Sequence, residues 1–336
     1  MTQVSVVIPV YNSQGHLERC LASIAVQTLR EIEVICVDDG SIDASPGILN
    51  RWAADDLRFH VLTQKNAGPG SARNAGFALA SGKYTIFLDS DDWFEPDFLE
   101  EMVRRARETD ADITICRSEE FDTQTGETRP SEWMLKERLL PRDCFRPMEA
   151  AKHLLQFTYG WTWDKLYRTR FIREAGISFP ELPNSEDLVF VFQSLAVAER
   201  IAILSKTFVH HRINRIESVS NSRRWAPEVP AQALMMLKEA MQIRGVYDIF
   251  EQSFMNWAME FLIWNVANMG DKYAQRVYYY KLKREWLSQM GFEARPWNYY
   301  TDRFTYSKYL LVRYVPYPVF CAILGLYQKL KEISQC

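Results

Sequence analysis

The first hundred residues alternate between short apolar runs and stretches with helical periodicity. Four runs rich in β-branched and aromatic residues are predicted to be buried strands: 4–10, 33–37, 59–62 and 84–88. The segments between them place apolar residues at helical spacing, with helices expected over 13–27, 44–54 and 71–80. The first helix should begin at Ser13, a residue type favoured at the N-cap. Strands and helices in this alternation predict a doubly wound α/β fold with a mostly parallel sheet flanked by helices.

Two of the predicted strands end in acidic residues. Asp38 and Asp39 follow the second strand, and Asp89 and Asp91 follow the fourth. Because ligands bind beyond the carboxyl ends of strands in such sheets, both pairs are expected to face one crevice. Since side chains alternate along an extended chain, Asp89 and Asp91 should project the same way and could hold Mg²⁺ or Mn²⁺ against a diphosphate. The alternative is that these acids begin the next helix, with Pro96 in its first turn.

A glycine-rich turn lies between the third strand and the helix after it. The segment from Gln64 to Asn74 reads QKNAGPGSARN. Lys65, Arg73 and the backbone amides at the helix start could meet an anionic group such as a phosphate. The segment matches neither a Walker A loop nor the GxGxxG motif, so a purely structural turn is an equal alternative.

Composition and charge limit which classes of protein the chain can belong to. The 336 residues are 47% hydrophobic and 25% charged, which is ordinary for a globular chain long enough to form two domains. A net charge of −3 argues against nucleic acid as a partner. The six cysteines include no Cys-x-x-Cys pair, which favours reduced thiols in a cytoplasmic protein. Neither a signal peptide nor a membrane span is expected from the pattern of apolar residues.

Four segments, taken in order, resemble family 2 glycosyltransferases with the GT-A fold. They are VSVVIPVYN, EVICVDDGSID, NAGPGSARNAG and GKYTIFLDSDD, and they span most of residues 3–100. The similarity continues more loosely through WDKLYR (163–168), the acidic pair at 186–187 and HHRINRIESVS (210–220). The resemblance implies a catalytic domain over residues 1–225 that moves a sugar from a nucleotide sugar to an acceptor hydroxyl.

The resemblance also implies how the nucleotide is bound. Pro9 and Tyr11 would form the wall under the base, and Asp39, or alternatively Asp38, would accept a hydrogen bond from it. A carboxylate that accepts from an imide N–H suits uracil, so the expected donor is a UDP-sugar. A turn or cap role before Gly40 is the alternative for Asp38.

The same resemblance implies which residues would bind the metal. Asp91 would bind Mn²⁺ or Mg²⁺ directly, and Asp89 would lie at the ribose or in the outer shell of the metal. The metal would bridge the diphosphate and stabilise its charge as the bond to the sugar breaks. Residues 208–212 alternate as a strand, so His210 and His211 should face opposite sides, and only one, here His211, could complete the metal shell. Arg212 or Arg215 could meet the diphosphate.

The acidic pair Glu186–Asp187 is the expected source of the catalytic base. Ser185 can cap a helix whose first turn holds both acids, a position where acids are common because of the helix dipole. The family places its base in such a pair, which implies Asp187 as the base and Glu186 as the residue that orients it or touches the acceptor. The implied reaction is a single displacement with inversion at the anomeric carbon.

Aromatic residues before the acidic pair are expected to contact a saccharide acceptor. Trp161 and Trp163 offer faces for sugar rings and Lys165 lies beside them, although tryptophans packed in the core are the alternative. Residues 221–225, NSRRW, approach the Gln-x-x-Arg-Trp motif of processive synthases but have Asn for Gln. Because those enzymes also carry membrane spans, one sugar is expected to be added per encounter.

The region 226–336 is predicted to be helical. One of its helices is expected to be amphipathic, with these residues on one face: Phe250, Phe254, Trp257, Phe261 and Trp264. The region is rich in aromatic residues, which leaves three roles open: packing on the catalytic domain, formation of a homodimer, or contact with a lipid interface.

The apolar stretch 309–327 is interrupted by Pro316 and Pro318, which should break a helix. Its tyrosines and flanking cations favour a helix lying in the plane of a membrane surface. Such peripheral contact at the inner face of the cell membrane would suit a lipid-linked saccharide acceptor in surface-polysaccharide or glycolipid synthesis.

Two further functions compete with glycosyl transfer. The chain could be a nucleotide-sugar-binding subunit without catalysis that partners an active paralogue, which the joint presence of Asp39, Asp91 and Asp187 argues against. It could also be a sugar nucleotidyltransferase, but the glycine-rich basic loop that such enzymes place after their first strand is replaced by Pro9-Val10-Tyr11-Asn12.

Overall fold

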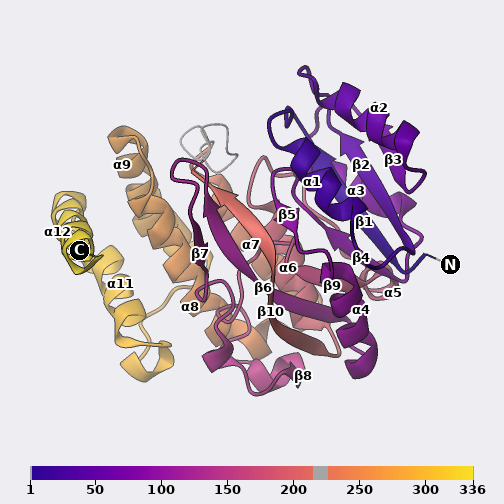
Figure 1. Cartoon of the computed structure of the whole chain (residues 1–336). Helices are drawn as coiled ribbons and strands as arrows, with labels where there is room; N and C mark the ends of the chain where they lie inside the picture. The colour runs from indigo at the N-terminus through magenta and orange to yellow at the C-terminus, as the bar shows by residue number, and fades with distance from the viewer. Residues whose placement is uncertain (1, 215–225, 336) are drawn as a thin grey trace. The chain divides into compact units, whose positions relative to one another are not determined.

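The computed structural model describes residues 2–214 and 226–335, with side chains through Leu326 (Figure 1). The chain divides into two compact units, Met1–Ser218 and Val219–Cys336. The predicted boundary after residue 225 falls at the end of the segment 215–225, which lies outside the described residues.

The first unit is built on a sheet in which the strand order is β3-β2-β1-β4-β9-β6-β10-β5, with β7 beside β6 and β8 beside β10 (Figure 1). The strands are β1 (Val4–Val10), β2 (Ile32–Asp38), β3 (Phe59–Thr63), β4 (Tyr84–Phe87), β5 (Trp93–Phe94), β6 (Ile113–Asp122), β7 (Thr128–Pro130), β8 (Cys144–Phe145), β9 (Lys165–Arg168) and β10 (Ile201–Ile213). The parallel pairing of β1 with β2 and β4, and of β2 with β3, confirms the predicted parallel core. Beyond β4 the sheet is mixed, because β9 runs antiparallel to both β4 and β6.

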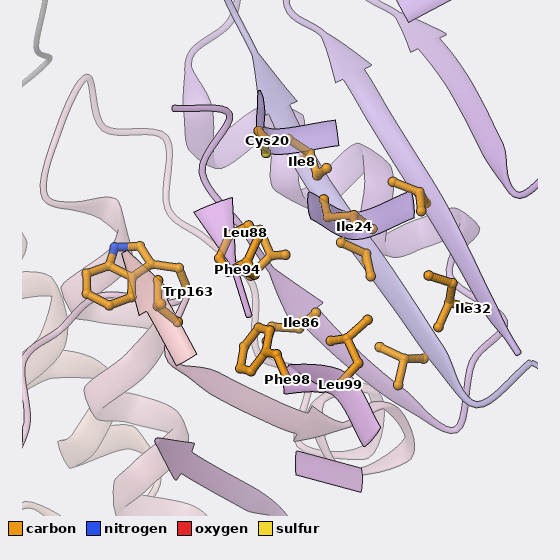
Figure 2. Packing of buried hydrophobic residues seen from close by; sticks show 14 of the residues in the cluster. Ile8, Cys20, Ile24, Ile32, Ile86, Leu88, Phe94, Phe98, Leu99 and Trp163 are labelled. Carbon is orange, nitrogen blue, oxygen red and sulfur yellow. The ribbon is translucent and has the colours of Figure 1, made fainter. Parts of the chain in front are cut away.

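Helices cover both faces of this sheet. They are α1 (Leu17–Ala25), α2 (Ser45–Asp55), α3 (Pro69–Leu79), α4 (Phe98–Thr109), α5 (Thr169–Glu174) and α6 (Glu186–Val197), with the short 3-10 turns η1 (Glu137–Leu139) and η2 (Pro147–Ala150). Alternation along β1 separates the faces. Ile8 belongs to a core cluster with residues of α1 and α4 (Figure 2), whereas Val7 faces α3. A Cβ added at Gly76 of α3 would lie 2.5 Å from Val7 Cγ1, so glycine lets this helix pack closely on the strand.

The predicted start of the first helix is wrong, and the alternative that placed Asp89 and Asp91 in the first turn of a helix also fails. α1 begins at Leu17 rather than at Ser13, whose Oγ lies 2.8 Å from the Oγ of Ser90 in the turn after β4. The helix after β4 begins at Phe98, with β5 intervening, so Asp89 and Asp91 do not belong to its first turn. The alternative that these acids simply begin a helix is thereby excluded.

The second unit is helical, as predicted. It contains α7 (Val229–Ile243), α8 (Tyr247–Ala267), α9 (Lys272–Lys281), the π-helical segment η4 (Leu282–Trp286), α10 (Leu287–Gln289), η5 (Trp297–Tyr299), α11 (Arg303–Tyr314) and α12 (Tyr317–Gln335). The predicted break at Pro316 is confirmed, because α11 ends before it and α12 begins after it.

The prediction that α8 buries a single aromatic face is wrong. Phe250, Phe254 and Trp257 are buried, but so are residues on other sides of the helix such as Met255, whereas Trp264 is 47% exposed. A helix that is apolar nearly all round is buried on most of its circumference, so its aromatic spacing alone did not define one face.

No helix in the described ranges is long and apolar enough to cross a membrane. The cysteines of the described residues are all free thiols.

Candidate active site

Three carboxylates gather where the chain leaves β4. The strand ends at Phe87, and the amide of Asp92 then donates to the carbonyl of Asp89 across a turn. One oxygen from each of Asp89, Asp91 and Asp92 lies within 4.8 Å of the others. The clustering was predicted for Asp89 and Asp91, but its cause is this turn rather than alternation along a strand. Asp92 was missed, although the acidic run in the sequence contained it.

This acid cluster fits a hard divalent cation. Carboxylate oxygens are the ligands that Mg²⁺ and Mn²⁺ prefer, and Mg²⁺ is commonly held by one or two of them together with substrate phosphates. Asp91 and Asp92 are buried and Asp89 is half-buried. Three carboxylates this close repel one another, so the cluster requires positive charge nearby.

A histidine supplies part of that positive charge. Nδ1 of His211 lies 3.1 Å from Asp92 Oδ2, and the backbone amide of Arg212 donates to Asp92 Oδ1 at 2.8 Å. Burial alone would lower the pKa of His211, but the carboxylates, with Asp92 foremost, raise it to about 9. The metal-ligand role of His211 stays a prediction; it would require loss of a proton and use of Nε2, because Nδ1 faces Asp92.

The neighbouring His210 turns the other way, as predicted for adjacent strand residues. Its ring nitrogens lie 2.6 Å from Glu119 Oε1 and 2.8 Å from Glu95 Oε1, and its ring stacks on Trp93. The side chain of Arg212, unlike that of His210, lies at the acid cluster, where its Nε donates to the carbonyl of Asp91 at 2.9 Å. Arg215 and the segment 221–225 lie outside the described residues.

A buried arginine joins the acid cluster to the acidic pair of α6. Arg73 donates from Nη2 to Asp89 Oδ1 at 2.8 Å and from Nη1 to Glu186 Oε1 at 2.6 Å. Both Arg73 and Glu186 are buried. Burial opposes the charge of Arg73, but Asp89 and Glu186 more than compensate and raise its pKa. Arg73 therefore holds Asp89 and Glu186 in position, and the donor contact expected of Arg73 stays a prediction.

A glycine makes this connection sterically feasible. A Cβ at Gly70 would lie 2.8 Å from the carbonyl oxygen of Pro180 and 3.0 Å from Cγ of Glu186. Any larger residue would push the beginning of α3 away from the beginning of α6. The glycine-rich turn thus allows two helix starts to approach, which the sequence pattern did not reveal.

Asp187 has the acid–base properties that a general base needs. It is half-buried, and its Oδ1 accepts the amide of Leu188 at 2.7 Å. Burial and the adjacent charge of Glu186 raise the pKa of Asp187 to about 7. Ser185 precedes α6 and both acids lie in its first turn, as predicted, but the side chain makes no capping hydrogen bond, because its Oγ donates to Asn184 Oδ1 instead.

Asp39 organises the glycine-rich turn. Its Oδ1 accepts from Gln64 Nε2 at 2.7 Å and from the amide of Ala67 at 2.9 Å, and its Oδ2 accepts from the amide of Gly68 at 2.8 Å. A carboxylate has about four acceptor sites, so this network leaves room for one further donor. Any contact with a base would add to this structural role.

The other predicted donor residues differ in exposure. Asp38 is buried and its Oδ1 accepts the amide of Ser41 at 3.0 Å, which is the turn role considered as its alternative. Pro9 is half-buried, whereas Tyr11, just beyond the end of β1, is 51% exposed. Lys65 is exposed.

The acceptor contacts predicted for Trp163 and Lys165 are wrong. Trp163 is 1% exposed and belongs to the core cluster (Figure 2). Lys165 is fully buried, and its Nζ donates to the carbonyls of Tyr159 and Trp161 and to Asp164 Oδ1. Neither side chain can reach an acceptor, because Trp163 is packed in the core and against His211 of β10, and Lys165 is enclosed by residues 159–164.

The chain is similar to proteins of known sequence and to one of known structure. The chain is 38% identical over 216 residues to EpsH of Bacillus subtilis (strain 168), which covers 63% of this chain and 61% of EpsH. It is 27% identical over 330 residues to the cholesterol galactosyltransferase of Borreliella burgdorferi, covering 91% of this chain and 87% of that protein. The crystal structure of Staphylococcus aureus TarS 1–349 in complex with UDP-GlcNAc superposes with a TM-score of 0.69 at 23% identity, covering 86% of this chain and 82% of that one. This similarity confirms the predicted GT-A fold.

The family model described as glycosyl transferase family 2 matches residues 5–175. That match spans about half of the sequence and includes β1, β4 and the acid cluster, so the chain belongs to glycosyl transferase family 2.

Proposed function

We propose that this protein is an inverting, metal-dependent glycosyltransferase that moves one sugar from a UDP-sugar to an acceptor hydroxyl. The observation that carries the proposal is the pair of hydrogen bonds from Arg73, which ties Asp89 of the acid cluster to Glu186 beside Asp187. A charged donor and a catalytic base must lie close together for one displacement to occur. Arg73 holds Asp89 and Glu186, which adjoin the proposed metal ligand and the proposed base, within the span of one guanidinium.

The nucleotide would lie over the ends of β1 and β2. Tyr11 and Pro9 would form the wall under the base, and Asp39 would use its remaining acceptor capacity for an imide N–H. The related TarS structure contains UDP-GlcNAc, which supports a uridine nucleotide here. Asp38 would act through the turn that it holds, and exposed Lys65 would approach the phosphates only by extending its side chain.

The acid cluster would hold Mn²⁺ or Mg²⁺ with Asp91 as the direct ligand and Asp89 beside it. A bound divalent cation would stabilise the negative charge that develops on the diphosphate. Asp92 would remain paired with His211 and would fix the turn. Arg212, already hydrogen-bonded to the carbonyl of Asp91, would add positive charge near the leaving group.

Asp187 would be the base. The acceptor oxygen would form a bond to the anomeric carbon from the face opposite the diphosphate, while the bond between that carbon and the UDP oxygen breaks. The acceptor proton would pass to the carboxylate of Asp187, and UDP would leave with the bonding electron pair. A pKa of about 7 lets this carboxylate be deprotonated at neutral pH and still accept a proton effectively.

The acceptor would be a saccharide or lipid-linked saccharide used in surface-polysaccharide or glycolipid synthesis. The relative named cholesterol galactosyltransferase, which aligns over most of both chains, supports an acceptor that contains a lipid. In the second unit, Val319, Ile323 and Leu326 are exposed and lie on one face of α12. We infer that this face rests on the inner surface of the cell membrane and that a homodimer is the competing use of it.

Release of UDP from a panel of UDP-sugars, with Mn²⁺ or Mg²⁺, tests the proposal. Metal-dependent release from one donor, lost in Asp91→Ala and strongly reduced in Asp187→Asn, would support it. Pyrophosphate as the product would indicate a nucleotidyltransferase. Binding of a UDP-sugar without turnover in the presence of any tested acceptor would indicate a non-catalytic subunit.

A further inference from the structure

A row of aromatic rings extends from the acid cluster toward solvent. Trp163 stacks on His211 with centroids 5.0 Å apart, Trp161 stacks on Trp163 at 5.2 Å, and Tyr159 stacks on Trp161 at 5.0 Å. Trp133 closes the outer end, 4.8 Å from Tyr159 and 5.6 Å from Trp161 in edge-on contacts. The inner ring is buried, whereas Tyr159 and Trp161 are half-buried and Trp133 is 38% exposed.

The three outer rings lie on the acceptor side of the crevice. β9 pairs antiparallel with β4, so the segment that enters β9 lies near the end of β4 where the acids cluster. β9 is the neighbour of β4 on the side away from β1 and β2, which carry Tyr11 and Asp39. The rings therefore lie on the side of the acid cluster opposite to the proposed nucleotide.

A buried lysine holds the backbone that carries two of the outer rings. Buried Lys165 donates to the carbonyls of both Tyr159 and Trp161, and its charge is balanced by buried Asp164 at 2.6 Å. An ordered aromatic surface costs little further conformational entropy when a ligand binds. Lys165 does not itself reach an acceptor, but it fixes the segment whose rings, Tyr159 and Trp161, could contact one.

We propose that Trp133, Tyr159 and Trp161 form a subsite that binds a sugar ring of the acceptor. This subsite rests on the proposed function, because its position is defined relative to the donor side. Tryptophan and tyrosine combine a broad apolar face with a polar edge, and this matches the apolar C–H face and the hydroxyl rim of a pyranose. The proposed base site at Asp39 lies on the other side of β4, which favours a sugar over a nucleotide base as the occupant.

Two measurements separate this subsite from the proposed function. The first is UDP release from the preferred UDP-sugar, without acceptor and with p-nitrophenyl β-glucoside, β-galactoside or N-acetyl-β-glucosaminide. The second is saturation-transfer NMR of the same three glycosides with the protein alone, which requires no turnover. The variants are Trp161→Ala, Trp161→Phe and Trp133→Ala, with Trp297→Ala, a 61% exposed tryptophan of the second unit, as the matched control.

Loss of one stacking ring should raise the KM for the effective glycoside about tenfold in Trp161→Ala and less in Trp133→Ala. Donor hydrolysis without acceptor should stay within about twofold of wild type in Trp133→Ala, whose ring contacts Tyr159 and Trp161 at the outer end of the row. Trp161→Phe should recover most of the loss because a ring is retained. Saturation transfer should weaken in the alanine variants and persist in Trp297→Ala.

Equal loss of acceptor-free hydrolysis in folded Trp161→Ala and Trp133→Ala would overturn the subsite. So would saturation transfer that is absent in wild type or unchanged by both substitutions. If wild type releases no UDP from any donor, the proposed function fails, but the NMR comparison still decides whether these rings bind sugar.

Discussion

Charged side chains are mostly buried and paired in the crevice of the first unit, whereas two arginines on the helices of the second unit are exposed. In the crevice, Arg73, Asp89 and Glu186 pair at short distances, and most of the participating side chains are buried. In the second unit, Arg276 and Arg284 are exposed on α9 and η4, beside a Tyr273 that is 78% exposed. Burying charges is costly unless their geometry is fixed, so the crevice favours one preorganised arrangement. Exposed cations beside aromatic and aliphatic groups suit a partner of loose geometry such as a lipid surface.

The contrast predicts the largest functional loss at Asp91. Replacing it with alanine should lower kcat for UDP release by about a thousandfold or more, because charge stabilisation worth several kcal/mol is lost. Removing metal with EDTA should have the same effect on wild type, and added Mn²⁺ should restore it. The matched control is Glu108→Gln, an exposed acid paired with Arg104, which should be silent. Activity that persists in EDTA would contradict the metal role of the cluster.

Asp187→Asn should produce the next largest effect. Amide for carboxylate removes the proton acceptor while preserving shape, so kcat should fall by about 10²- to 10⁴-fold. Since the base must be deprotonated, wild-type kcat/KM should rise with pH up to about 7, the pKa of Asp187, and level off above it. The measurement is a pH profile between the limits at which the fold is intact by circular dichroism. A profile already level well below pH 7, or a variant with wild-type kcat, would remove Asp187 from the mechanism.

Arg73→Gln should affect both stability and catalysis. The substitution leaves Glu186 buried without its charged partner, which should cost about 3–5 kcal/mol in the free energy of unfolding. Arg73 also lowers the pKa of Asp187, so any residual activity should show its pH midpoint moved upward. Thermal unfolding and the pH profile measure the two effects, with Arg104→Gln, which removes exposed ion pairs, as the control.

An unmoved pH midpoint in Arg73→Gln would mean that the arginine supports the fold without acting on the base. Unchanged thermal stability would mean that its two ion pairs are as weak as surface pairs. Either result would weaken the contrast between the buried, paired charges of the crevice and the exposed charges of the helical unit.

The local sequence pattern predicted much of this site, but it failed for side chains whose role depends on whether they are buried. β1 to β4 and the opposite directions of His210 and His211 follow from period-two alternation, and strand order predicts that acids gather at the end of β4. Their signals lie within a few residues of one another along the chain. The turn that brings Asp89 and Asp91 together was not predicted.

Trp163 and Lys165 failed as acceptor contacts for a physical reason. Whether an aromatic or basic side chain faces solvent depends on distant segments that cover it, and those are not visible in the local pattern. The bond from Arg73 to Glu186 joins residues 113 positions apart, and the close approach at Gly70 depends on the backbone of Pro180. Such contacts exist only once the sheet has brought α3 and α6 together.

The smallest predicted effect concerns the surface of the second unit. α9 and α12 pack through Tyr279 and Phe320, whose ring centroids are 4.7 Å apart. They carry exposed cations and exposed apolar groups respectively. Arg276→Gln and Arg284→Gln should each weaken binding to vesicles containing phosphatidylglycerol by about fivefold, with little change in UDP release from soluble substrates. Co-sedimentation at low and high salt measures this, with neutral phosphatidylcholine vesicles and the Arg104→Gln variant as controls. Because the attraction is electrostatic, added salt should erase the difference between variant and wild type. Equal sedimentation of wild type and both variants would contradict a membrane role for these cations, and a dimer in solution that is lost in Ile323→Ser would then identify the α12 face as a contact between two copies of the chain.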